Sequence, residues 1–587
     1  FGQPTVAALA ATLGHGRQVE VPANRIPAGC TQITPDMLPL VELEPAAIER
    51  IVATVPGGAA NVQDIYPLAP LQEGILYHHL SSPEHDPYVL QSRMAFASRD
   101  RLHAFVDALG KVIARHDVLR TSVLWDGLPQ ALQVVWRQAG LALFEVADET
   151  AVPHALALDQ APLVRLYHWP DAQGAGRQAV LQFHHIVLDH TALDVLGREL
   201  VGYLQGAPVP AEQGAPYRNY VAQARLGVSQ AEHEAFFREQ LGDIDEPTLP
   251  FGLGDVQVDG LGIEEAQLWL DETLATGLRQ QARQLGISVA SLFHLAYARL
   301  LAAASGRDSV VFGTVLLGRL EGGAGADQAL GMFINTLPLR LDLAGLDLQD
   351  AVRLTQQRLS ALLAHEHASL ALAQRCSGVP APAPLFSAML NYRHGSQADE
   401  DQRQALQGIE TLDSNERSNY PLSLSVDDIG ERFRLVALAP AEVGAARVCE
   451  QMRRVLEAMA EALAHQPRQA LLQLPVLSAE ERDQLVHDFN RTAQPHDLTR
   501  TLQELFEAQA LRRPEAVALS AEQGELNYEQ LNAQANRLAH HLIALGVRPD
   551  DRVAICVERG LSLVVGLLAI LKAGGAYVPL DPDYPAE

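Results

Sequence analysis

The stretch from residue 179 to residue 190 limits the possible folds of this chain more than any other. It reads Ala-Val-Leu-Gln-Phe-His-His-Ile-Val-Leu-Asp-His, and its first part has the length and composition of a buried β-strand. If the strand continues to Ile186, side chains alternate between two faces. His185 then lies with the apolar residues before it, and His184 lies on the opposite face. The sequence therefore predicts a covered sheet with two imidazoles at the end of one strand.

A histidine pair alone is a weak indicator of chemistry, because three occur here: His78-His79, His184-His185 and His540-His541. Most such pairs are structural or lie on a surface. The central pair differs because it ends an apolar strand and because Asp189 follows at a fixed spacing. An imidazole can take or give a proton near neutral pH. We expect Asp189 to anchor the loop by pairing with a cation.

The length and charge of the chain exclude several classes of protein. With 587 residues the chain is too long for one core, so several folded units are expected. Its net charge of −27 argues against nucleic acid and against an anionic membrane surface as partners. The 4 cysteines have no paired spacing, which suits a reducing cytoplasm and speaks against a zinc site or a disulfide framework. No apolar run is long enough to span a bilayer. The chain is expected to be an excised piece of a longer cytoplasmic protein.

Periodicity predicts a mixed α/β chain. In the first half it indicates helices and strands in turn, over residues 70–79, 101–114, 119–125, 130–135, 163–169, 179–186 and 191–205. In the second half it indicates them over residues 288–304, 310–317, 331–340, 350–364, 385–392, 419–428, 431–438 and 444–464. From residue 502 a regular alternation of helix and strand begins, as at the start of an α/β sheet.

No metal site is expected. His365 and His367 flank Glu366, but alternate residues of a helix do not share a face.

Four motifs together resemble the condensation domains of nonribosomal peptide synthetases. Residues 184–190 resemble the HHxxxDG signature, and residues 115–121, Arg-His-Asp-Val-Leu-Arg-Thr, resemble the RHxxLRT motif. Residues 331–336 resemble the GxFVNT motif, and residues 419–422, Asn-Tyr-Pro-Leu, resemble a late motif of that family. They occur in the family's order and at its usual spacings.

The flanks carry further resemblances. Residues 526–531 and 571–582 look like the first two core motifs of adenylation domains, and residues 1–13 resemble the last helix of a peptidyl carrier domain. The expected domains are therefore a carrier helix, a linker, the two condensation lobes, a second linker and an adenylation fragment, over residues 1–13, 14–63, 64–245, 246–474, 475–500 and 501–587. The carrier's phosphopantetheine-accepting serine motif and the phosphate loop of the adenylation domain are absent from this sequence.

Two departures point to a subtype. His190 stands where the family usually has glycine. Residues 78–86 look like the extra HH[I/L]xxxxGD motif of dual condensation/epimerisation domains, with His85 in place of its glycine. His190 is also common in that subtype. The resemblance therefore implies a dual domain, which inverts the donor residue from L to D and then condenses.

The resemblance implies an α/β fold of two lobes like chloramphenicol acetyltransferase, arranged in a V as a pseudo-dimer, plus an incomplete α/β adenylation segment. Donor and acceptor then meet at His185, each tethered to 4'-phosphopantetheine on an upstream or downstream carrier domain, and no cofactor is bound directly. The implied catalytic residues are His185, His184, Asp189, His78 and His79. Support of the site is expected from Arg319, His190, Arg120 and Asn335, with Arg319 as the partner of Asp189, and substrate binding from Tyr420 and Glu416.

Three alternatives stay open. In a plain condensation domain, His78 and His79 only shape the donor channel. A free-standing acyl-CoA acyltransferase shares the HHxxxD chemistry, but the carrier and adenylation flanks count against it. A non-catalytic carrier-docking module is expected to lose the motif histidines, and both are intact here.

Overall fold

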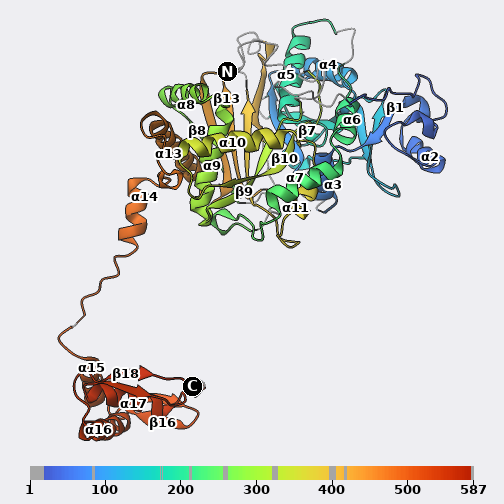
Figure 1. Ribbon diagram of the computed structural model, residues 1–587. Coiled ribbons are helices and arrows are strands. Elements are labelled where there is room, and N and C mark those ends of the chain that lie inside the picture. Colours follow the sequence, from blue (N-terminus) through green and yellow to red (C-terminus); the bar gives the residue numbers. More distant parts are fainter. Residues whose placement is uncertain are drawn as a thin grey trace. The chain divides into compact units, whose positions relative to one another are not determined.

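The computed structural model describes residues 19–81, 86–171, 174, 176–209, 214–254, 262–319, 328–395, 405–414, 420–496 and 498–583. The predicted carrier helix at residues 1–13, together with His85, Glu416 and Asn419, lies outside the described residues. The chain divides into two compact units, Phe1–Arg482 and Asp483–Glu587 (Figure 1). Each unit is described by itself.

The first lobe of the larger unit is built on a five-stranded sheet with the order β12-β2-β7-β6-β5. Its strands are β2 (Val89–Phe96), β5 (Ala142–Glu145), β6 (Val164–Pro170), β7 (Arg177–His184) and β12 (Ile409–Ser414). All pairs are antiparallel except β5 with β6. Helices α4 (Arg99–Arg115) and α5 (His190–Leu204) pack against each other, and their apolar faces enter the core of this lobe.

The second lobe has a six-stranded sheet with the order β10-β9-β11-β13-β14-β8. Its strands are β8 (Ile263–Trp269), β9 (Ser309–Leu316), β10 (Asn335–Asp342), β11 (Ala388–His394), β13 (Leu422–Ile429) and β14 (Arg432–Pro440). Four helices cover it, with α13 on β8 and β14 and α10 on β10 (Figure 1): α8 (Glu272–Leu285), α9 (Val289–Ser305), α10 (Leu348–Leu363) and α13 (Ala445–His465). Within the described ranges no single helix has the length and apolar character to cross a membrane. Only α8 and α9 taken as a pair, bent by 108°, meet those criteria.

The two lobes exchange segments across residue 245, where the sequence places a domain boundary. Strand β12 comes late in the chain but pairs with β2 of the first sheet. Residues 329–333 contribute buried side chains to the first core. Conversely, α7 (Gln230–Leu241) packs on α11 (Leu370–Arg375), and its Phe237 is fully buried in the second core. These exchanges hold the lobes together around the space between them.

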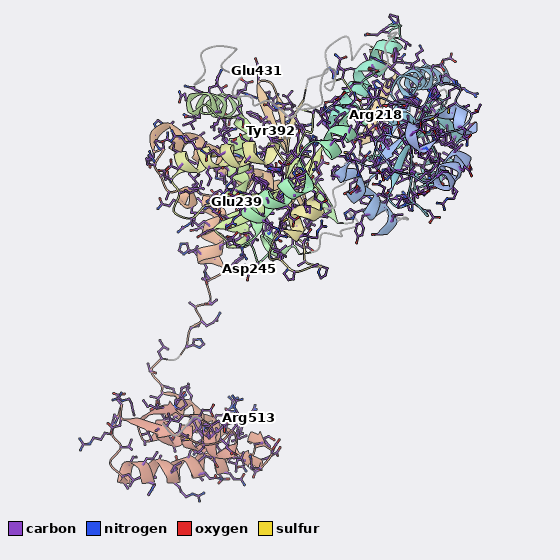
Figure 2. All side chains as sticks on the ribbon, turned by 45° about the vertical axis from the view of Figure 1, so that its right-hand side comes forward. Arg218, Glu239, Asp245, Tyr392, Glu431 and Arg513 are labelled. Carbon is purple, nitrogen blue, oxygen red and sulfur yellow. The ribbon has the colours of Figure 1, made fainter. Side chains whose placement is uncertain are left out.

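Residues 19–61, which fall in the segment that the sequence assigns to a linker, pack onto the first lobe. Helix α2 (Pro45–Thr54) and the turns before it share one apolar core with a three-stranded sheet of order β1-β4-β3, formed by β1 (Val62–Pro67), β3 (Thr121–Leu124) and β4 (Leu132–Trp136). Helix α6 (Arg218–Leu226) begins at Arg218, which Figure 2 labels, and is tied to β1 by the buried ion pair of Arg218 and Asp64, at 2.6 Å. Helix α3 (Pro70–Ser81) follows β1 and lies against β10 of the second lobe.

Side-chain caps fix where several helices begin. Ser98 accepts the Arg101 N–H at the start of α4, and Asp189 accepts the Ala192 N–H at the start of α5. Each such cap contributes about 1 kcal/mol. Shorter helical turns complete the chain: η1 (Pro35–Met37), η2 (Gly58–Asn61), η3 (Val118–Arg120), η4 (Glu149–Ala151), η5 (Pro250–Gly252), η6 (Leu471–Gln473), α14 (Ala479–Asp483) and the π-helical turn η7 (Gln484–Asp488).

The strand that carries the central histidine pair ends earlier than the sequence predicts. β7 stops at His184, so a strand through Ile186 is wrong. The Ile186 N–H is held by His184 Nδ1 at 3.1 Å, and the Val187 N–H turns back to the His184 carbonyl at 3.3 Å. Because these two backbone N–H groups bond locally, they cannot extend the hydrogen-bond ladder between β7 and its neighbouring strands.

The predicted strand over residues 331–340 also begins later, at Asn335. The Phe333 N–H donates to the Asp189 carboxylate at 2.9 Å, and the Gly331 carbonyl accepts the Asp189 N–H at 3.1 Å. This segment is therefore bound to the end of the histidine motif instead of to a neighbouring strand.

The smaller unit alternates helices with short strands. Strands β15 (Val517–Ala521) and β16 (Gly524–Asn527) pair antiparallel, and β17 (Arg552–Ile555) and β18 (Ala576–Pro579) pair parallel. Helices α16 (Tyr528–Ala544) and α17 (Leu561–Lys572) pack together beside α15 (Leu502–Arg512). Its core is small, and large apolar side chains such as Leu511 and Leu545 are exposed.

Candidate active site

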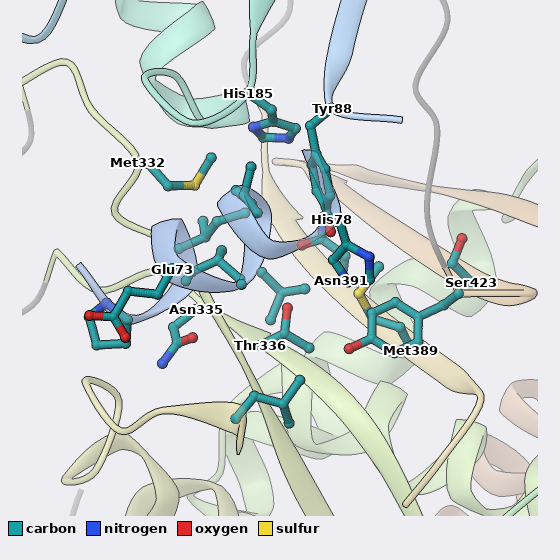
Figure 3. A pocket seen from close by; sticks show the side chains of 18 of the residues that line it. Glu73, His78, Tyr88, His185, Met332, Asn335, Thr336, Met389, Asn391 and Ser423 are labelled. Atoms are coloured by element: carbon teal, nitrogen blue, oxygen red, sulfur yellow. The ribbon is translucent and has the colours of Figure 1, made fainter. Parts of the chain in front are cut away.

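A cavity of about 580 Å³ is lined by residues of both lobes of the larger unit. Helix α3, the start of β2 and the turn after β7 line it from the first lobe, and β10, α11, β11 and β13 line it from the second. Figure 3 shows His185 and Tyr88 together at one side of this cavity, with His78 at the end of α3, and it also labels Asn335, Asn391 and Ser423 of the second lobe. Imidazoles from one lobe and amide and hydroxyl groups from the other therefore line the same cavity.

His185 is the motif histidine that reaches this cavity. Its backbone N–H donates to the Tyr88 carbonyl at 2.8 Å, which fixes the first residue after β7. Its ring is half-buried, and among the described residues its buried Nδ1 has no hydrogen-bond partner. An imidazole ring that lines a cavity can accept a proton from a substrate or orient it.

His184 points the other way and is fully buried. Its Nδ1 accepts the Ile186 N–H at 3.1 Å, so the ring proton of the neutral form lies on Nε2. That Nε2 donates to Asp86 Oδ2 at 2.9 Å. Burial lowers the pKa of His184, against the opposing effect of Asp86, and the ring stays neutral at neutral pH.

Asp86 joins the two histidine pairs. Besides His184, its Oδ2 lies 2.6 Å from Nδ1 of His79, and its Oδ1 accepts the Tyr88 N–H at 2.9 Å. Burial acts to raise the pKa of this carboxyl, but the hydrogen bonds from His184, His79 and the backbone outweigh it and hold the pKa well below 3.8. The carboxylate is therefore ionised although its side chain is fully buried.

His79, Asp86 and His184 also form the only group, in the part of the chain that the structure describes, whose three ligand atoms are close enough to share a metal ion. These atoms lie within 4.8 Å of one another. The hydrogen bonds favour a different state. A His184 Nε2 that carries a proton has no lone pair for a metal, and both rings already have the carboxylate as acceptor. The group is built as a hydrogen-bonded cluster.

His78 lines the cavity, whereas its neighbour His79 is buried on Asp86. The ring of His78 lies 5.9 Å from that of Tyr88, and the ring of Tyr88 lies 6.4 Å from that of His185. Burial lowers the pKa of His78, and the charge of Asp86 partly opposes this. His78 and His185 therefore line the same cavity on either side of one tyrosine.

Asp189 is an anchor in the first core. Its Oδ1 caps α5 through the Ala192 N–H at 2.7 Å and pairs with Arg319 Nη2 at 3.2 Å, and its Oδ2 accepts the Phe333 N–H. The Arg319 guanidinium lies over the Phe333 ring at 4.1 Å. Gly318, with φ of 62°, permits this approach, because a Cβ there would collide with the Phe333 carbonyl oxygen. Both carboxylate oxygens of Asp189 thus serve the backbone, and one of them also pairs with a cation.

The other predicted site residues divide between the cavity and its surroundings. His190, Asn335 and Tyr420 line the cavity. Asn335 donates to the carbonyls of Glu366 at 2.8 Å and Ala368 at 2.7 Å, and its buried Oδ1 has no partner among the described residues. Tyr420 is stacked on Phe386 at 5.6 Å.

Arg120 does not line the cavity. It is buried in the first lobe, where it donates to the Ile113 carbonyl at 3.2 Å, to Gln63 at 3.0 Å and to the Trp136 carbonyl. Its contacts join the end of α4 to the ends of β1 and β4. Glu416 lies outside the described residues.

Sequence reasoning missed two residues of the site, Asp86 and Tyr88. Asp86 is the last residue of the extra motif, so a signal for it was present in the sequence. Tyr88 ends the turn before β2, and no pattern in the sequence marks it.

Comparison with known proteins identifies the family. The model of the condensation domain matches residues 62–486. This chain belongs to the condensation-domain family. A second model, of the AMP-binding enzymes, matches residues 506–587. The predicted order, a condensation domain followed by the start of an adenylation domain, is confirmed.

The related proteins are peptide synthetases. Malpinin synthetase of Mortierella alpina is 45% identical over 602 residues, which cover 100% of this chain and 8% of the relative. Malpibaldin synthetase of the same organism is 44% identical over 606 residues, covering 100% of this chain and 11% of the relative. Bacitracin synthase 3 of Bacillus licheniformis is 27% identical over 553 residues, covering 90% of this chain and 9% of the relative. The chain therefore spans only a small part of the length of each of these proteins.

Solved structures share the fold. The four-domain nonribosomal peptide synthetase holo-AB3403, bound to AMP and glycine, matches with a TM-score of 0.66 and 20% identity, over 89% of this chain and 42% of that chain. The first condensation domain of the calcium-dependent antibiotic synthetase, in complex with a substrate analogue, matches with a TM-score of 0.55 and 19% identity, over 70% of this chain and 99% of that chain. At such identities the likeness shows the fold alone. It confirms the predicted α/β architecture of two lobes plus an adenylation segment.

Proposed function

We propose that the condensation domain joins a donor and an acceptor, both held as thioesters on 4'-phosphopantetheine arms of carrier domains, and that it first epimerises the donor Cα from L to D. The upstream and downstream carrier domains and an adjoining adenylation domain are then its partners. The observation that carries the proposal is His185, the motif histidine whose ring lines the cavity between the lobes.

Peptide bond formation needs a neutral, oriented amine. The amine nitrogen attacks the thioester carbon, the C–N bond forms, the C–S bond breaks, and the proton lost by the amine passes to the leaving thiolate. His185 orients or deprotonates the amine during this step. Asp189 takes no proton, because the caps and the ion pair described above use its oxygens.

Epimerisation makes a second demand on the same cavity. The Cα–H of a thioester is a weak acid, so a base removes the proton and an acid returns one to the opposite face. One imidazole does not supply both faces. His78 and His185 both line the cavity, which supports them as the two groups, whereas His79 does not line it and holds Asp86 through its Nδ1.

The test uses the whole chain in D₂O. An upstream carrier is loaded with an all-L peptidyl donor, a downstream carrier is loaded with an aminoacyl acceptor, and the product is analysed by mass spectrometry and chiral chromatography. We expect a new peptide with deuterium and D configuration at the donor Cα. If the peptide keeps the L configuration and protium at the donor Cα, the epimerase activity is excluded and the chain is a plain condensation domain. Absence of any peptide above the rate without enzyme overturns both activities.

A further inference from the structure

We propose that Asp86 is a positioning residue that fixes the two cavity histidines, His78 and His185, relative to each other through a buried cluster with His79 and His184. This inference rests on the proposed function and adds to it a residue that touches no substrate. Asp86 does not line the cavity, whereas both histidines that it would position do.

The Asp86 carboxylate makes three hydrogen bonds, and each partner is a cavity-lining residue or the sequence neighbour of one. Asp86 Oδ2 holds His79, the neighbour of His78, at 2.6 Å, and holds His184, the neighbour of His185, at 2.9 Å. Its Oδ1 accepts the N–H of Tyr88 at 2.9 Å. The end of α3, the start of β2 and the end of β7 thus meet on a single side chain.

The cluster also reaches the His185 backbone. Tyr88, whose N–H is held by Asp86, accepts the His185 N–H with its carbonyl at 2.8 Å. Val89, the residue after Tyr88, pairs with His184 in the β2–β7 ladder. His185 is therefore held from two sides, by its own backbone bond to Tyr88 and by the fixed ring of His184 before it.

The protonation state of the cluster favours support over proton transfer. The Asp86 side chain is fully buried and its pKa is held far below neutral, and burial lowers the pKa of His184. An ionised acceptor with a neutral His184 as its donor keeps this hydrogen bond across the neutral range. Truncating one partner of such a buried charged group leaves the other uncompensated.

The decisive variant is Asp86→Asn, which keeps the size of the side chain and removes its charge. Asp107→Asn, at an exposed carboxylate of α4, is the matched control. In the D₂O assay we expect Asp86→Asn to lower deuterium incorporation at least tenfold, and to lower peptide formation less, because condensation needs His185 alone. Its pH profile of deuterium incorporation should move to lower pH, since the negative charge that raises the pKa of His78 is gone.

A second measurement reads the cluster directly. In the chain labelled with ¹⁵N-histidine, the hydrogen-bonded ring N–H groups of His79 and His184 should give two downfield NMR signals that exchange slowly with water. Both should be lost or shifted upfield in Asp86→Asn and retained in Asp107→Asn.

The outcomes separate the inference from the proposed function. If the two activities of Asp86→Asn fall by the same factor with an unmoved pH profile, its role is only to maintain the fold, and the inference is overturned. Stoichiometric metal in the purified protein also overturns it. If the wild-type chain shows no deuterium incorporation, the epimerase part of the proposed function fails. Asp86 is then judged by the two NMR signals and by whether the pH profile of peptide formation changes.

Discussion

The two histidine pairs of the condensation domain are built alike and arranged in opposite order. At the end of α3, His78 lines the cavity and His79 is bound to Asp86. At the end of β7, His184 is bound to Asp86 and His185 lines the cavity. Each pair thus supplies one ring to the buried cluster and one to the reaction space.

The order differs because the two backbones differ. Neighbours on a helix are about 100° apart, so the ring of His79 turns inward while that of His78 stays at the edge. At the end of β7 the His184 ring is buried on Asp86, and His185, the first residue after the strand, is fixed by its N–H bond to the Tyr88 carbonyl with its ring on the cavity. A histidine pair can therefore combine an anchored ring with a cavity-lining ring in either kind of element, and only the local geometry tells which is which.

The largest expected effect tests the cavity-lining ring of the strand pair. His185→Ala should lower peptide formation and deuterium incorporation by about 10²- to 10⁴-fold, because in the proposed mechanism both steps use this imidazole. Initial rates of both reactions, measured with loaded carriers, test this prediction. The control variant is His154→Ala, at an exposed histidine of the same lobe. Rates close to wild type would remove His185 from both mechanisms.

The next effect compares the two anchored rings. His184→Ala should lower the free energy of unfolding by about 3 kcal/mol, because it leaves a buried charge and a cavity. His79→Ala should cost roughly half as much, since 11% of its side chain is exposed and water can replace part of the bond. Urea unfolding of both variants measures the two losses of unfolding free energy. Equal losses would contradict the predicted order.

A smaller effect isolates the cavity-lining ring of the helix pair. His78→Gln should lower deuterium incorporation by about 10²-fold while peptide formation stays within about threefold, because in the proposed mechanism only proton transfer at Cα uses His78. His154→Gln is the matched control. Loss of both activities together would instead assign His78 to the shape of the cavity.

The smallest expected effect is a loss of folding stability at acidic pH. Burial lowers the pKa of His184 below 6.5, so the unfolded chain binds more protons than the folded chain below that pH. Stability from this group is complete above about pH 6.5 and is lost as the pH falls towards the folded-state pKa, by at most about 1.4 kcal/mol per pH unit. Unfolding of wild type and His184→Gln between pH 7 and 5 tests this. The variant should show the shallower slope, and equal slopes contradict the assignment.

The regular elements were largely predictable, because periodicity and caps are local. The helix that opens at Pro70 and the helix after Asp189 both occur, as α3 and α5. The ends of two strands were not predictable, because they depend on side chains. β7 ends where His184 takes the Ile186 N–H, and β10 starts late because Asp189 takes the Phe333 N–H.

By itself the sequence determined the family, the two-lobed fold, and the choice of His185 and Asp189 as the residues to examine. The tertiary structure alone decided that Asp86 lies between His79 and His184, although it is separated from His184 by 98 residues. That contact follows from the pairing of β2 with β7 and the packing of α3 beside them. Local patterns encode the period of each element, whereas a buried hydrogen bond between three elements depends on how they pack, and no single stretch of sequence contains that information.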